Sequence, residues 1–151
     1  WRRVAGVICD RRESVRVKGK VYKTVVRPEM LYGLETLTLS KRQEVELEVA
    51  ELKMLRFSLR VTRMGRILTN KFIKGKAREG RLRWFVHVQR RDMGYISRRM
   101  LRMEPPERMK RERPKRRFMD VMREDMQVVG LKEADAEDRW IWRQMIHCGN
   151  P

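Results

Sequence analysis

The sequence predicts an all-α, multi-helix protein, and three observations support this prediction. Apolar residues recur at spacings of three or four over most of the chain. Helix-capping residues precede several of these runs, and glycine or proline follows them. Only residues 34–39 alternate between apolar and polar side chains in the manner of a β-strand. We therefore expect short helices with brief connections, and a short strand or extended linker at 34–39.

An amphipathic helix is predicted from residue 15 onward. Val17, Val21 and Val25 recur every four residues, beside Tyr22. Pro28 lacks the backbone N–H that an interior helical position needs, so a kink or break is expected just before it. The following LYG segment is expected to form a last turn that ends at its glycine.

A second helix is predicted over residues 41–59. Ser40 and Gln43 fit the capping box, in which each side chain bonds to the backbone of the other residue. Acidic residues dominate its first half and basic residues its second, as the helix dipole favours. Its expected inward stripe consists of Val45, Val49, Leu52, Leu55 and Leu59.

The middle of the chain is expected to form several shorter helices. Thr62 can cap one that carries Ile67, Leu68, Phe72 and Ile73. Gly75 and Gly80 are expected to bracket a basic connection before a helix at 82–88. Asp92 can cap a further helix, which carries Tyr95, Ile96, Met100 and Met103 and ends before Pro105.

Two helices are predicted at the C-terminal end. Phe118, Met122, Met126 and Val129 share one helical face, and Gly130 is expected to adopt the left-handed stop conformation. Another helix is expected from Asp138 to Cys148. Its expected inward side chains are Trp142, Met145 and Ile146.

The charge of the chain points to a polyanionic partner. Its 38 Lys and Arg against 20 Asp and Glu give a net charge of +18. Nucleic acid is the expected partner of such a surface, ahead of an anionic membrane face. Residues 81–117 alone carry +10, whereas residues 118–151 carry −3. This last segment is therefore expected to pack against the basic body or face solvent, without touching phosphate.

The sequence offers little for catalysis, metal binding or membrane insertion. No run approaches the ~20 apolar residues of a spanning helix. Cys9 and Cys148 are expected to be free thiols in a reducing nuclear or cytoplasmic compartment. Zinc spacing is absent, so no cofactor is expected, and His87 is interpreted as a packing or hydrogen-bonding residue. The acid pairs, such as Glu124 with Asp125, are interpreted as acids at helix starts, not as Mg²⁺ ligands.

Five blocks of sequence occur in the order of a known family. They are KVYKTVVRPEMLYGLET, AELKMLR, EGRLRWFVHVQRRD, RPKRRFMD and DRWIWRQMI. Together they resemble the C-terminal part of non-LTR (LINE) retrotransposon polyproteins, particularly the RTE-like group, over nearly the whole chain. The resemblance implies a helical reverse-transcriptase thumb near residues 15–60, followed by a C-terminal tail. It also implies an upstream polymerase palm that holds the catalytic aspartates, and no matching aspartate pair occurs in this chain.

This resemblance and the charge pattern together predict four segments. Residues 1–60 would be a thumb-like helical segment, 61–103 a basic helical segment, 104–117 an exposed basic linker, and 118–151 an acidic helical pair. The expected function is non-catalytic gripping of RNA or an RNA–DNA duplex. Trp84 is expected to pack in the core and not to stack on bases. The candidate contacts are Lys18, Lys20, Lys23, Arg27, Arg81, Arg83, Arg90, Arg91, Arg98, Arg99, Arg102, Lys110, Arg111, Arg113, Lys115, Arg116 and Arg117.

Two other functions stay open. One is a helical protein-interaction module of retrotransposon origin, whose Met-rich faces, with 11 Met in the chain, would bind a partner helix. The other is a small Mg²⁺-dependent nuclease, which would need an acid cluster with abnormal titration. Salt-sensitive RNA binding would favour the gripping function, and salt-insensitive binding to a protein would favour the interaction module.

Overall fold

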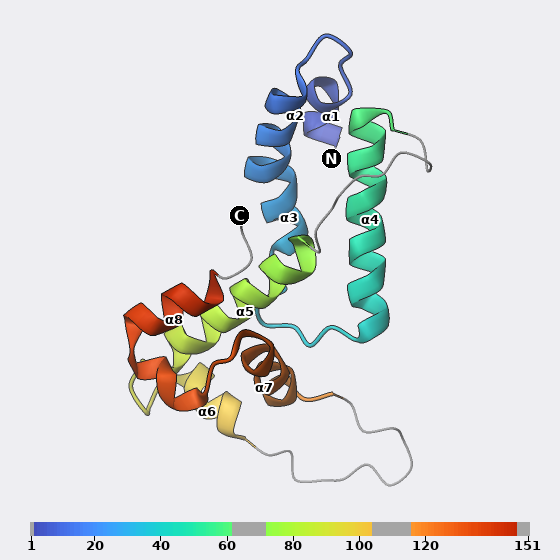
Figure 1. Ribbon diagram of the computed structural model, residues 1–151. Helices are drawn as coiled ribbons and strands as arrows, with labels where there is room; N and C mark the ends of the chain where they lie inside the picture. The colour runs from blue at the N-terminus through green and yellow to red at the C-terminus, as the bar shows by residue number, and fades with distance from the viewer. Residues whose placement is uncertain (1, 62–71, 104–115, 148–151) are drawn as a thin grey trace, which may run out of the picture. The chain divides into compact units, whose positions relative to one another are not determined.

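The computed structural model describes residues 2–61, 72–103 and 116–147 (Figure 1). Within these ranges the secondary structure is helical and includes no strand, which confirms the all-α class. The chain divides into two compact units, one of residues 1–33 with 39–76 and one of residues 34–38 with 77–151. This division falls inside helix α5 (Phe72–Gln89), so it does not follow the expected boundaries at 60, 103 and 117.

The first unit begins with helices α1 (Arg2–Ile8) and α2 (Val15–Val21), the second capped by Ser14. A π-helical turn (Tyr22–Val26) leads directly into α3 (Arg27–Leu31). The chain does not break before Pro28, but the regular α-helix is interrupted there as expected, by the π turn that ends at Val26. Pro28 then lies in the first turn of α3, where its missing N–H is tolerated. The expected stop is confirmed, because α3 ends at Leu31 and Gly33 has a φ of +76°.

Residues 34–39 form turns and irregular backbone, so the expected short strand is wrong. The backbone N–H of Leu37 donates to the carbonyl oxygen of Leu34, which closes a turn. A single alternating segment needs a second strand to satisfy its ladder, and the described part of the chain provides none.

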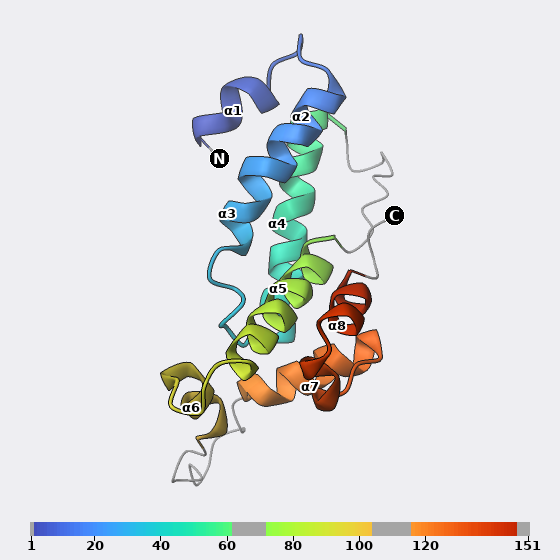
Figure 2. The ribbon, with the colours of Figure 1, turned by 90° about the vertical axis from the view of Figure 1, so that its left-hand side faces the viewer.

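Helix α4 (Lys41–Leu59) has the expected bounds and the expected capping box between Ser40 and Gln43. It runs antiparallel beside α2 and α3 (Figures 1 and 2). The predicted apolar stripe is confirmed only in part, because Val45 and Val49 are 55% and 42% exposed whereas Leu55 packs against the core. Glu51 and Ser58 are the buried positions of this helix.

The core of the first unit is small and partly polar. Its buried members are Ile8, Tyr22 and Val26, and Met54 and Leu55 of α4 pack against them. Glu51 and Ser58, and not the two valines, are the α4 residues that face inward and bind the neighbouring helices. Glu51 accepts a hydrogen bond from the Tyr22 hydroxyl at 2.6 Å, and the backbone N–H of Ile73 donates to its other oxygen at 3.3 Å.

The second unit contains the later part of α5, then α6 (Ile96–Arg102), α7 (Phe118–Val129), a 3₁₀ turn (Glu133–Glu137) and α8 (Arg139–Ile146). Gly75 and Gly80 lie inside α5, so the basic connection expected between them is wrong. A glycine costs a helix about 1 kcal/mol, and burial of Leu82 and Phe85 along α5 outweighs that cost.

The predicted core of the C-terminal helices is confirmed. Met122 and Met126 on α7 and Trp142 and Ile146 on α8 are buried together with Phe85. The Phe85 and Trp142 rings stack with centroids 6.3 Å apart, and Trp142 Nε1 donates to the Leu82 carbonyl oxygen at 3.3 Å. The stop at Gly130 is also confirmed by its φ of +75°.

Two acidic residues at predicted helix starts behave differently. The Asp138 carboxylate caps α8 by accepting from the N–H groups of Trp140 and Ile141. Asp92 does not cap α6, where Tyr95 occupies the cap position without a side-chain bond. The apolar side chains expected to face inward on α6 are largely solvent-exposed, with Ile96 at 70%.

Candidate anion-binding pocket

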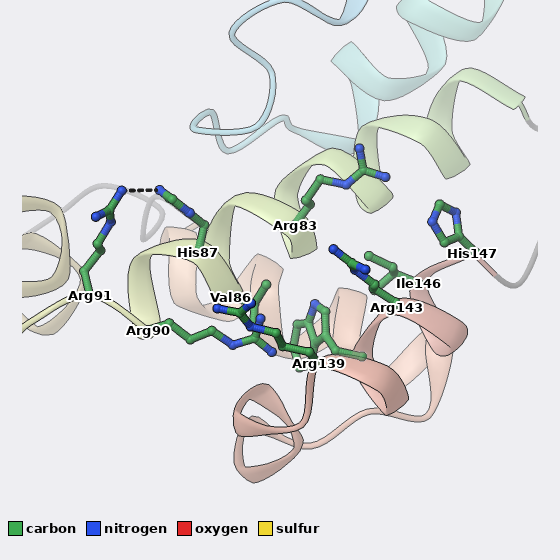
Figure 3. A pocket seen from close by; sticks show the side chains of 10 residues that line it. Arg83, Val86, His87, Arg90, Arg91, Arg139, Arg143, Ile146 and His147 are labelled. Atoms are coloured by element: carbon green, nitrogen blue, oxygen red, sulfur yellow. Dashed lines mark hydrogen bonds between the residues drawn. The ribbon is translucent and has the colours of Figure 1, made fainter.

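A basic pocket lies between α5 and α8 in the second unit (Figure 3). Its volume is about 790 Å³, within the usual range of small-molecule sites. No carboxylate is among the described residues that line it. The lining residues are Arg83, Val86, His87, Arg90, Arg91, Arg139, Trp142, Arg143, Ile146 and His147.

Helical spacing explains why the basic side chains converge on this pocket. Arg83 and His87 are four residues apart on α5, and Arg91 follows after a further four, two residues beyond the end of that helix. Arg139 and Arg143 have the same interval on α8. Both helices are anchored by the buried core of the second unit. Each of them therefore positions basic side chains at the edge of the same pocket.

Arg90 is the most constrained of these arginines. Its Nε donates to the Ala136 carbonyl oxygen at 2.9 Å. Figure 3 shows Arg90 extending from α5 toward α8, and Arg139 extending back toward it. Burial lowers the pKa of Arg90, and the nearby charges of Arg139 and Arg143 lower it further, while Asp138 acts in the opposite direction. The positive charges of Arg139 and Arg143 therefore act on Arg90 although all three side chains are exposed.

Two carboxylates lie near the pocket, and both already bind other groups. Glu79 accepts from Arg83 at 2.6 Å and lies 3.3 Å from Nδ1 of His147. Asp138 holds the N-terminus of α8. The side chains of Arg139 and Arg143 form no hydrogen bond or ion pair with the part of the chain that the structure describes.

His87 does not pack in the core, and of the two expected roles it has the hydrogen-bonding one. It is exposed and lines the pocket, and its Nε2 lies 3.4 Å from the Arg91 guanidinium. Trp84, three residues earlier on α5, does pack as expected, since its ring meets Phe118 edge-on with centroids 5.3 Å apart.

Two predicted nucleic-acid contacts are buried inside the protein instead. Lys18 donates its ammonium to the Ser58 carbonyl oxygen at 3.2 Å. Arg81 forms a two-pronged ion pair with Asp125, at 2.7 Å from Nε and 3.1 Å from the terminal nitrogen. Neither cation is available to a phosphate, so both assignments are wrong. Asp125 also lies in the middle of α7 and not at a helix start.

The remaining predicted contacts of the first unit differ in exposure. Lys20 and Lys23 are exposed on α2 and the π turn. Arg27 is half-buried, lies 3.5 Å from Glu51 and stacks over the Tyr22 ring at 5.3 Å. Arg27 is therefore bound within the protein, while the two lysines face solvent.

In the second unit the structure brings Arg83, Arg90 and Arg91 together at the pocket. Other predicted contacts lie away from its lining. Arg99, Arg102 and Arg117 are exposed, Arg98 donates to the Arg91 carbonyl oxygen, and Arg116 pairs with Glu124. Lys110, Arg111, Arg113 and Lys115, and most of the expected linker with them, lie outside the described residues.

Arg139 and Arg143 were missed by the sequence analysis. They belong to the acidic segment 118–151, whose net charge of −3 led us to expect no phosphate contact. Averaging the charge over the segment hid two arginines four residues apart on one helical face. His147 continues the same spacing, and this local pattern was the signal that could have identified them.

No family model, curated protein or solved structure matches this chain. In the part of the chain that the structure describes, no helix is long and apolar enough to cross a bilayer. No group of three or more His, Cys, Asp or Glu side chains is placed to hold a metal ion among these residues.

Proposed function

We propose that this chain binds nucleic acid without performing chemistry, as the C-terminal part of a reverse transcriptase similar to those of non-LTR retrotransposons. The arginine pocket between α5 and α8 is the observation that supports this most directly. Guanidinium groups bind phosphate oxygens through paired N–H donors. Backbone phosphates occur at every nucleotide, so the expected partner is RNA or an RNA–DNA duplex, bound without regard to sequence.

Exposed cations elsewhere add to this proposal. Lys20 and Lys23 in the first unit, and Arg99 and Arg102 on α6 in the second, face solvent and can meet a phosphate backbone. In the proposed parent protein, an upstream palm in the nucleus or cytoplasm would supply the polymerase chemistry. This chain would hold the template and primer.

The test is the salt dependence of binding. The chain should bind an RNA–DNA hybrid with a logarithmic slope of about −4 or steeper against salt concentration, because several phosphates are neutralised. Hybrids of unrelated sequence should bind alike. A slope near zero, or no binding at ~50 mM salt, would overturn the proposal.

A protein-interaction module remains the second candidate, and exposed apolar side chains favour it. Val45, Val49 and Phe57 on α4 are exposed, as are Ile96 and Met100 on α6. Met122 and Met126 of α7 are buried and do not contribute to a Met-rich binding face, whereas Met93, Met100 and Met103 are exposed. Protein binding that is insensitive to salt and lost in Val49→Ser/Phe57→Ser would favour this candidate.

A further inference from the structure

We infer that the arginine pocket between α5 and α8 binds a phosphate monoester carried by a nucleotide, such as the phosphorylated end of a nucleic-acid strand. The inference rests on the proposed nucleic-acid function and specifies the group that this pocket takes. Four properties of the pocket support it: its concave shape, the convergence of its cations, the lack of an ion pair for Arg90, Arg139 and Arg143 within the described part of the chain, and its apolar floor.

The shape and charge of the pocket favour an end over an internal phosphate. A phosphodiester carries one negative charge, whereas a monoester carries about −1.5 to −2 and offers three acceptor oxygens. Arg90, Arg139 and Arg143 lie close enough for their charges to interact. A single group with several oxygens and two charges can bind these converging donors, and an extended backbone would spread its charges along a surface.

The partners of these arginines also indicate a missing anion. Arg139 and Arg143 are unpaired within the described part of the chain, and Arg90 binds only a neutral carbonyl oxygen there. Like charges held close together repel one another, and an anion bound among them relieves that repulsion. The three side chains are exposed, so an anion from solution can reach them. Glu79 cannot supply that charge, because it is bound to Arg83.

The pocket volume of about 790 Å³ leaves room for the nucleoside part. Val86, Trp142 and Ile146 line the pocket and are buried in the core of the second unit. Because Trp142 is already stacked on Phe85 and almost fully buried, it cannot offer a face to a base. Recognition would therefore depend on the phosphate and be indifferent to which base follows.

The experiment uses the whole chain and single-stranded RNA 12-mers of one sequence, with a 5′-phosphate, a 3′-phosphate or neither. At ~150 mM salt, a phosphorylated strand should bind about tenfold more tightly than the strand without a terminal phosphate. Equal affinity of all three strands would overturn the inference, while the proposed nucleic-acid function would stand. No binding of any strand or hybrid would overturn the proposed function as well.

A pair of matched variants locates the effect. Arg139→Gln/Arg143→Gln should bind the strands with and without a terminal phosphate about equally tightly. Arg11→Gln/Arg12→Gln removes the same charge from exposed positions in the first unit and should keep the tenfold preference. Circular dichroism should show equal helical content in both variants. A preference retained in Arg139→Gln/Arg143→Gln would overturn the assignment to this pocket.

A nucleoside 5′-monophosphate, tested as a competitor, distinguishes the source of the monoester. Competition at a concentration similar to that of the phosphorylated strand would identify a free nucleotide as a sufficient ligand. Competition only at a concentration at least a hundredfold higher would identify the strand end, whose adjoining phosphates add contacts. Either result supports the pocket, whereas a nucleoside without phosphate that competed equally well would overturn the inference.

Discussion

Tyr22 donates its hydroxyl hydrogen to Glu51 across 2.6 Å in the interior of the first unit, joining the π turn to the middle of α4. Burial raises the pKa of Tyr22 well above its ordinary value, and the hydrogen bond and negative charge of Glu51 raise it further. The protonated tyrosine is therefore the form that the folded protein selects.

The stability of the first unit should fall in alkali because of this pair. A folded-state pKa above the ordinary value of about 10 means that the stabilisation is complete below pH 10 and is lost as the pH rises toward the folded-state pKa. The loss is at most about 1.4 kcal/mol for each pH unit above 10. Urea unfolding followed at pH 8 and pH 11 measures it.

Tyr22→Phe is the control for this alkaline loss, because lysines also lose charge at high pH. The variant should be less stable than the original chain at pH 8, where the hydrogen bond to Glu51 is missing. Between pH 8 and pH 11 it should lose less stability than the original chain does. Identical losses in both proteins would contradict the role of Tyr22.

The buried ion pair of Arg81 and Asp125 should be costly to break. The Arg81 side chain is only 2% exposed, so Asp125→Asn would leave a buried cation without its charge partner. The expected loss of unfolding free energy is about 3–5 kcal/mol. Asp120→Asn is the control, since its exposed pair with Arg123 should contribute less than ~1 kcal/mol. Similar losses in the two variants would contradict the conclusion that the Arg81–Asp125 pair is buried and the Asp120–Arg123 pair exposed.

Two methionines of the second unit should differ sharply on truncation. Met122 is fully buried in the core, so Met122→Ala should cost about 2–5 kcal/mol. Met100 on α6 is 64% exposed, so Met100→Ala should change stability by less than ~0.5 kcal/mol. Chemical denaturation checks both values. A loss above ~1.5 kcal/mol for Met100→Ala would contradict the exposure of Met100 and show that this side of α6 is buried.

The basic stretch that the sequence analysis identified gives a separate prediction. Changing Lys110, Arg111, Arg113, Lys115, Arg116 and Arg117 to Gln should flatten the logarithmic salt slope for duplex DNA by several units, up to about 5. All duplex sequences should weaken alike, and helical content should stay nearly unchanged. An unaltered slope would place the duplex-binding surface elsewhere, with exposed Lys20 and Lys23 as the next candidates.

Local signals predicted the helix ends well. Ser40 with Gln43, Gly33 and Gly130 act as expected, because caps and stops depend on bonds within a few residues. Asp92 is the exception, since Tyr95 takes the cap position of α6. Which side of each helix is buried was harder to predict. The inward face of α4 depends on how a buried carboxylate is bonded by other helices, and apolar spacing alone carries no information about such long-range partners.

The candidate site was predicted only in part, for a similar reason. Arg83, Arg90 and Arg91 were identified from a dense basic run, and the structure places them at one pocket. Arg81 stands in the same run, yet it is buried against a carboxylate 44 residues away. Which arginine of a run meets solvent depends on helix rotation, and which segment completes the pocket depends on packing between α5 and α8.

The π turn at Tyr22–Val26 fits one more residue into the helical stretch without rotating its two ends against each other. In the turn the backbone N–H of Arg27 bonds to the carbonyl oxygen of Tyr22, five residues back instead of four. The wider winding takes up the additional residue within about one rotation, so α2 and α3 keep their faces aligned. Lys18 on α2 can therefore bind the Ser58 carbonyl oxygen while Tyr22, in the turn itself, binds Glu51. One residue could be lost at this turn by conversion to a plain α-helix, whereas a residue lost from the α-helical part of α2 would turn Lys18 by about 100° away from Ser58.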